Sequence, residues 1–150
     1  MLRLSKKADY ALLAIRHLAA NSDRGAVSAR EVAEAYDIPS ELLAKVLQKL
    51  VRARLLGSHQ GTRGGYALAR AAALISVADV IQAVDGPLTV TACSDLDHSC
   101  EQYSKCNIRD PLWRIKDRIV SALAATSVAE LASDLHSPPG VTMPMAMLRK

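Results

Sequence analysis

The three cysteines of the chain lie close together in a polar stretch between residues 93 and 106. Cys93, Cys100 and Cys106 follow the spacing C-x6-C-x5-C, and the chain has no other cysteine. Thiolates are preferred ligands of zinc and iron–sulfur clusters, and such sites usually have four ligands. The spacing predicts a metal or cluster site that needs a fourth ligand besides the cysteines, because a disulfide set within the chain would leave one thiol over.

Length and composition favour a small helical protein. The 150 residues suffice for one domain with a modest core, and the absence of Phe leaves aliphatic residues to build it. No apolar run approaches the roughly 20 residues that a membrane-spanning helix needs. We expect no membrane partner and a cytoplasmic location, where thiols stay reduced and free to bind metal.

Basic charge is concentrated in the N-terminal half. Residues 1–70 hold 12 Lys and Arg against 6 Asp and Glu, a net charge of +6, whereas the rest of the chain has a net charge of −2. This distribution is the electrostatic footprint of nucleic-acid binding, although a solvated basic face would have the same composition.

The N-terminal residues predict two helices. Ser5 can cap a first helix that runs to about Ala20, and its apolar residues cover most of its circumference, so we expect it to be largely buried. Ser28 and Glu31 have the spacing of a capping box at the start of a second helix. Pro39 ends that helix, because the residue before a proline is pushed out of the helical region.

A third helix follows, with Ser40 as its expected cap, and its two faces differ. One face is apolar at helical spacing and the other is polar. The apolar residues are Leu43, Val46, Leu47, Leu50 and Val51. Together with the preceding helix and turn, this pattern predicts a helix-turn-helix, although an ordinary helical hairpin would give the same spacing.

The residues after the third helix favour a β-hairpin. Two short extended arms flank Gly61–Gly65, where glycines permit the positive φ values of a hairpin tip. A hairpin with Arg63 at its tip, directly after a helix-turn-helix, is typical of a winged helix, whose wing can enter the minor groove. The alternative is an exposed glycine-rich turn.

Two helices are predicted in the second half of the chain. Ser76 and Asp79 form a capping box before the first, and Asp110 with Pro111 begins the second, longer one. The long helix has a wide apolar surface, which favours dimerisation over packing within one chain.

The expected fold is mainly α: a winged helix-turn-helix with a small two-stranded β wing and a long C-terminal dimerisation helix. Residues 1–87 form the expected DNA-binding domain and residues 88–109 the cysteine segment. Residues 110–133 form the expected dimerisation region. Residues 134–150 have no sustained pattern and are expected to be a disordered tail.

The order of these parts resembles the Rrf-two family of bacterial winged helix-turn-helix regulators, which includes IscR-like and NsrR-like members. The resemblance covers about residues 1–133, and it is the shared order and spacing of the pieces that makes it specific. The matching pieces are LRLSKKADYAL, IPSELLAKVLQKL, GTRGGYAL, ISVADVIQAVDGP and the cysteine segment leading into PLWRIKDRI.

The resemblance implies a homodimer that binds a double-stranded DNA operator and acts as a transcriptional regulator, expected to be a repressor. The third helix would enter the major groove, and the long helix would cross to the partner. Cys93, Cys100 and Cys106 would hold a [2Fe-2S] or [4Fe-4S] cluster. The regulator would then sense redox state, nitric oxide or iron–sulfur status.

The fourth ligand is where this chain departs from part of the family. IscR-like members use a His three residues after the third cysteine, and Arg109, which cannot ligate, stands there. NsrR-like members can use an Asp early in the first helix of the other subunit, and Asp9 matches that position. Asp9 is the preferred hypothesis. His98, Asp110 and an exogenous thiol are the alternatives.

The expected DNA-binding face also departs from the IscR-like pattern, which has a Glu and an Arg where this chain has Ala44 and Gln60. The operator therefore cannot be inferred from those members. By residue type, Gln can pair with adenine and Lys with guanine or phosphate. The candidate DNA-binding residues are Ser40, Lys45, Gln48, Lys49, Arg52 and Arg63.

Two other interpretations remain open. One is a winged-helix regulator with a structural zinc site in which His98 completes a Cys3His set. The other is an iron–sulfur electron-transfer or carrier protein, which would leave the wing and the basic half unexplained. An enzyme is not expected, because the chain has no Cys-x-x-Cys and no glycine-rich phosphate loop.

Overall fold

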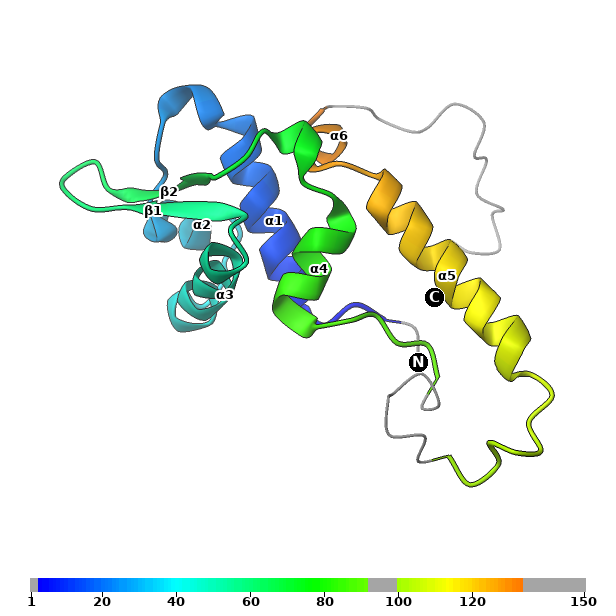
Figure 1. Ribbon diagram of the computed structural model, residues 1–150. Helices are drawn as coiled ribbons and strands as arrows, with labels where there is room; N and C mark the ends of the chain where they lie inside the picture. Colours follow the sequence, from blue (N-terminus) through cyan, green and yellow to red (C-terminus); the bar gives the residue numbers. More distant parts are fainter. Residues whose placement is uncertain (1–2, 92–99, 134–150) are drawn as a thin grey trace, which may run out of the picture.

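The computed structural model describes residues 3–91 and 100–133, which fold around one central helix. Figure 1 shows this helix, α1 (Lys6–Ala20), between a β-hairpin on one side and the long helix α5 (Arg109–Ala125) on the other. The remaining elements are η1 (Ser22–Arg24), α2 (Ala29–Ala35), α3 (Ser40–Arg52), β1 (Leu56–His59), β2 (Gly65–Leu68), η2 (Ala72–Leu74), α4 (Val77–Asp85) and α6 (Val128–Ala132).

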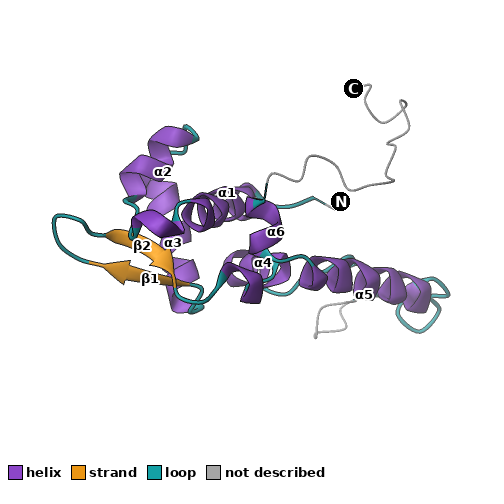
Figure 2. Cartoon of the chain, turned by 90° about the horizontal axis from the view of Figure 1, so that it is seen from above, coloured by secondary structure: helices purple, strands orange, loops and turns teal. Residues whose placement is uncertain are grey.

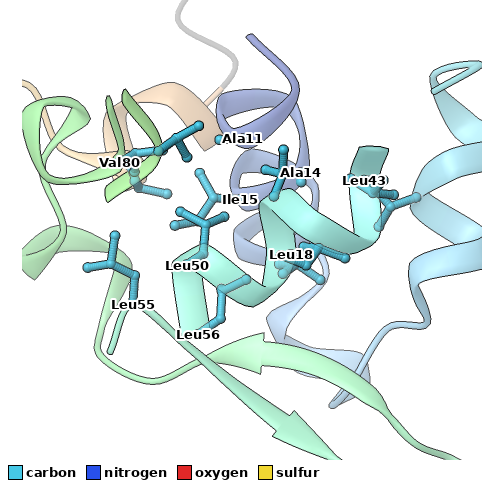
Figure 3. Packing of buried hydrophobic residues seen from close by; sticks show 14 of the residues in the cluster. Ala11, Ala14, Ile15, Leu18, Leu43, Leu50, Leu55, Leu56 and Val80 are labelled. Atoms are coloured by element: carbon cyan, nitrogen blue, oxygen red, sulfur yellow. The ribbon is translucent and has the colours of Figure 1, made fainter. Parts of the chain in front are cut away.

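The main hydrophobic core lies where α1 packs against α3 and α4. Ala11 and Ala14 are fully buried beside Ile15, and these small side chains let the neighbouring helices approach α1 closely (Figure 3). The apolar face predicted for α3 is buried, apart from Val51, which is half-buried. The 3.6-residue period of this helix therefore gave a correct prediction of its orientation.

The first helix is buried over less of its circumference than its composition suggested. One side packs against α3, α4 and α6, whereas Leu13 on the open side is 37% exposed and Leu12 is half-buried. Ser5 caps the helix as predicted, because its Oγ accepts a hydrogen bond from the Ala8 N–H at 3.0 Å.

The capping box predicted at the start of α2 is half formed. Ser28 Oγ accepts a hydrogen bond from the Glu31 N–H at 3.1 Å. The Glu31 carboxylate turns instead to Arg24, whose guanidinium donates at 3.1 and 3.3 Å, and to His17 at 3.5 Å. The hydrogen bond from Arg24 keeps the pKa of Glu31 below its ordinary value. A charged partner has therefore replaced the backbone N–H.

Two other predicted caps are wrong. The third helix begins at Ser40 itself, with Pro39 in the N-cap position, and a proline has no side-chain acceptor with which to cap. The long helix begins at Arg109, one residue before the predicted Asp110 cap. The carboxylate of Asp110 accepts a hydrogen bond from Arg109 Nε at 3.2 Å instead.

The predicted wing is an antiparallel hairpin of β1 and β2, with Leu56 opposite Leu68 and His59 opposite Gly65. The segment before α2 holds this hairpin through a bridge between Val27 and Tyr66, with backbone hydrogen bonds of 2.8 and 2.9 Å. The wing is therefore fixed to the helix-turn-helix by main-chain contacts. Figure 2 shows the hairpin beside α3 and at the opposite end of the molecule from α5.

The C-terminal elements leave the core and then return to it. The capping box predicted from Ser76 and Asp79 forms at the start of α4. The residues of the long helix α5 are exposed or half-buried, so the described part of the chain leaves much of its surface open. A second capping box, from Ser127 and Glu130, begins α6, and Val128 anchors this helix with a fully buried side chain.

Gly65→Ala should destabilise the protein. The backbone φ at this position is +153°, and a Cβ atom would lie 2.3 Å from the Val27 carbonyl oxygen, so the bridge that fixes the wing would have to open. We expect the free energy of unfolding to fall by about 2 kcal/mol or more in urea titrations.

Gly57→Ala in the same hairpin is the matched control, because the added Cβ would meet only His59 Nε2, at 3.8 Å. Its unfolding free energy should change by less than about 1 kcal/mol. An equal destabilisation of the two variants would contradict the role given to the close approach at Gly65.

Candidate DNA-binding face and cysteine site

The polar face of α3 is open to solvent because the opposite face is buried in the core. Four candidate DNA-binding residues lie along this face, and all four side chains are exposed: Ser40, Lys45, Gln48 and Arg52. They can therefore approach a base edge or a phosphate without rearrangement of the core, and their contact with DNA stays a prediction.

The tip of the wing carries the fifth exposed candidate, Arg63, between β1 and β2. The turn is tight: the Gly64 N–H donates to the Gly61 carbonyl at 2.9 Å, and a Cβ at Gly64 would lie 2.6 Å from the His59 carbonyl oxygen. Glycine is therefore needed at position 64, and the turn holds Arg63 away from the core.

Lys49 differs from the other candidates. It is half-buried, and its Nζ donates a hydrogen bond to the Val84 carbonyl at the end of α4, at 3.1 Å. Sequence reasoning missed this contact because Lys49 lies at the edge of the polar face. A helical period identifies which residues share a face, but not which neighbouring helix end a long side chain can reach.

The structure includes part of the predicted cysteine site. Cys100 and Cys106 are half-buried, free thiols, whereas Cys93 and His98 lie outside the described residues. Within residues 3–91 and 100–133, no three His, Cys, Asp or Glu side chains gather as a metal site would require. The described residues therefore supply two of the three predicted thiolates.

Asp9 is half-buried and lies on the open side of α1, in a largely apolar groove. The groove is lined by Lys6, Asp9, Tyr10, Leu12, Leu13, Arg16 and Leu131. It does not include Cys100 or Cys106. Asp110, the other carboxylate candidate, is exposed and hydrogen-bonded to Arg109.

Arg109 is held between two aromatic rings at the start of α5. Its guanidinium carbon lies 4.4 Å from the centroid of Tyr103 and 5.6 Å from that of Trp113. Nη1 also donates to the Tyr103 carbonyl at 3.2 Å. The hydrogen bond to Asp110 raises the pKa of Arg109 above its ordinary value, and the charge also interacts with Cys106. A permanent cation thus occupies the position where the resemblance to IscR-like members would place a ligand.

Comparisons with known proteins agree with this architecture. The profile of the Rrf2 family, described as "Iron-dependent Transcriptional regulator", matches residues 4–134. The chain belongs to this family. A Mycobacterium tuberculosis protein (strain H37Rv) named as an HTH-type transcriptional regulator is 35% identical over 135 residues, which is 87% of this chain and 81% of that protein. IscR of Xenorhabdus nematophila is 34% identical over 134 residues, which is 89% of this chain and 80% of that protein.

Solved Rrf2 structures have the same fold. CymR, the global cysteine regulator of B. subtilis, superimposes with a TM-score of 0.73 at 26% identity, covering 88% of this chain and 97% of CymR. IscR of T. potens gives a TM-score of 0.71 at 26% identity, covering 93% of this chain and 94% of that chain.

This Rrf2 chain is therefore a winged helix-turn-helix transcriptional regulator that binds DNA. The relatives named above are regulators and not enzymes, as expected. Among the described residues, no helix has the length and apolar character needed to cross a bilayer.

Arg63→Gln should weaken DNA binding uniformly across sequences. Log K decreases with log salt, and each phosphate that the protein neutralises makes this decrease steeper by about 0.9. The decrease should therefore be shallower by about 0.9 in the variant if Arg63 neutralises one phosphate. The measurement is fluorescence anisotropy over a salt series, with a DNA fragment selected from a random pool by the wild-type protein.

Arg114→Gln is the matched control, because Arg114 is an exposed arginine on α5, away from the wing. Its salt slope should equal that of the wild type. A wild-type slope for Arg63→Gln as well would show that the wing tip does not contact phosphate.

Arg109→Gln should loosen the C-terminal half of the cysteine segment, because it removes the charge held between Tyr103 and Trp113. Amide hydrogen exchange of residues 100–108 should become faster, while global stability falls by about 1 kcal/mol or less. Lys105→Gln, an exposed change in the same segment, should leave the exchange rates unchanged. Unchanged rates in Arg109→Gln would refute the ordering role of Arg109.

Proposed function

We propose that this Rrf2 protein is a homodimeric repressor that reports redox, nitric oxide or iron–sulfur status through a cluster held by Cys93, Cys100 and Cys106. The observation that carries the proposal is the donor set: every thiol of the chain lies in one short segment directly before α5. Thiolates suit iron–sulfur clusters, so the donor chemistry fits the group. When bound, the cluster would supply iron–sulfide bonds that react with oxidants and nitric oxide.

The open surface of α5 supports the dimer. Ile115 is 44% exposed, and Leu112, Ile119 and Val120 on the same helix are half-buried, so the described residues leave part of the apolar surface of α5 uncovered. Apolar surface of this kind is stabilised by burial against a partner. We assign it to contact with a second copy of the chain.

The groove beside Asp9 supports Asp9 as the fourth ligand, contributed by the partner subunit. The groove is largely apolar, Asp9 is its one carboxylate, and its exposed Leu13 offers apolar surface for the partner's α5. Because the cysteine segment directly precedes α5, docking of that helix in the groove would bring the thiolates toward Asp9. His98 and Asp110 are the competing ligands.

The roles of the DNA-binding face follow from side-chain chemistry. We assign Ser40, Lys45 and Gln48 to base edges in the major groove, and Arg52 and Arg63 to phosphate or the minor groove. Residues 1–87 would then bind the operator, residues 88–109 the cluster, and residues 110–133 the partner. The tail expected at residues 134–150 lies outside the described residues. We expect the protein to act in the cytoplasm.

The test is a comparison of operator affinity with and without the cluster. Protein purified without oxygen should show visible absorbance and contain iron and sulfide, and gel shifts should give different affinities for the two forms. Equal affinities would overturn sensing through the cluster. Zinc in place of iron would favour a structural zinc site with His98, and failure to bind any DNA would favour an electron-transfer or carrier protein.

Asp9→Ala should speed loss of the cluster in air, since a ligand is removed at the dimer interface. The measurement is the decay of visible absorbance. Asp23→Ala is the control, because Asp23 is an exposed acid in η1. An unchanged spectrum and decay rate in Asp9→Ala would exclude Asp9 and direct attention to His98 or Asp110.

A further inference from the structure

The last turn of α4 joins two other helices through side-chain contacts. The Val84 carbonyl accepts a hydrogen bond from Lys49 Nζ at 3.1 Å, and Lys49 belongs to α3. The Asp85 carboxylate accepts a hydrogen bond from Ser5 Oγ at 2.7 Å, and Ser5 is the N-cap of α1. The end of α4 therefore contacts both the start of α1 and α3, the recognition helix that is expected to enter the major groove.

The chemistry of a helix end explains why a lysine lies there. The last carbonyls of a helix have no partner within the helix, and the C-terminus carries partial negative charge. Gly86 ends α4 with a φ of +80°, and its N–H satisfies the Gln82 carbonyl at 2.9 Å. The Val84 carbonyl takes its hydrogen bond from the Lys49 ammonium, a charge-assisted donor.

The position of this turn in the chain connects it to both parts of the proposed sensor. Residues 88–109, with the cysteines, follow α4 directly. Ser5 precedes Asp9 by one turn of α1, since the Asp9 N–H donates to the Ser5 carbonyl at 3.1 Å. A shift of either the cysteine segment or the start of α1 would therefore act on the turn that Lys49 holds.

We propose that Lys49 is a positioning residue, which fixes the recognition helix to the end of α4 and so couples the state of the cysteine segment to DNA affinity. The inference rests on the proposed function and deepens it. Lys49 acts through the Val84 carbonyl rather than through phosphate. Coupling of this kind is a difference in affinity between two states, so its test has to compare both states.

Lys49→Met removes the donor and keeps the length of the apolar stem. Operator affinity is measured by anisotropy for cluster-loaded and cluster-free protein over a salt series. In the wild type we expect the higher of these two affinities to exceed the lower by a measurable factor. In Lys49→Met this factor should be at least threefold smaller, or close to one, while the slope of log K against log salt keeps its wild-type value. Lys49→Arg, which retains a charged donor, should restore the ratio.

Arg52→Met is the matched control, because Arg52 is an exposed cation on the same helix. Arg52→Met should leave the ratio of the loaded and cluster-free affinities unchanged. Its decrease of log K with log salt should be shallower by about 0.9 for each phosphate that Arg52 neutralises in the wild type. Lys49→Leu, which also lacks a side-chain donor, serves as a second variant if Lys49→Met does not give a cooperative thermal transition, and the same fall in the ratio is expected.

The possible results separate the two proposals. Equal affinities of the loaded and cluster-free wild type would overturn the proposed function before any variant is considered. A wild-type difference that persists in Lys49→Met would overturn the role of Lys49, and a reduced salt slope in that variant would assign Lys49 to phosphate. If the difference in affinity between the loaded and cluster-free forms disappears in Lys49→Met while the salt slope keeps its wild-type value, the result supports the coupling.

Discussion

The close packing of α1 against α3 and α4 is the constraint on which the rest of the structure depends. Ala11 and Ala14 have no exposed surface, so the neighbouring helices lie directly against the α1 backbone. Larger side chains there would force these helices apart, and interiors this dense do not absorb added volume without strain. The orientation of the polar face of α3, and with it the presentation of Lys45 and Gln48, follows from this contact.

The two sides of α1 lie in different environments. Its inner side builds the core, while its outer side carries Leu13 and Asp9 in an open groove, and α5 leaves the core with no fully buried residue. A chain with so much apolar surface on two separate elements gains most by burying one against the other in a second copy. In the proposed dimer, the ligand donors and the α3 helices of both subunits would be connected through α1 and α5.

Sequence patterns predicted the elements better than their ends. The apolar period of α3 and the capping box at Ser76 depend on local spacing, and both are present in the structure. The caps expected at Ser40 and Asp110 are wrong because Pro39 and Ile108 occupy the N-cap positions of α3 and α5. The contact of Lys49 with α4 and the open groove at Asp9 depend on how helices pack, which no single-helix pattern contains.

Arg109 bears on how the proposed site could work. A guanidinium keeps its charge and donates only, so it cannot replace the ligand that IscR-like members have at this position. Its contacts with Tyr103 and Trp113 instead link the end of the cysteine segment to the start of α5. If these contacts hold Cys106 close to α5 when a cluster is released, as the Arg109→Gln experiment tests, the other end of the segment, after α4, is where a change can act on the DNA-binding domain. The end of α4, which directly precedes the cysteine segment, is where Lys49 of α3 contacts the Val84 carbonyl, so the proposed coupling would pass from this segment to α3 at that contact.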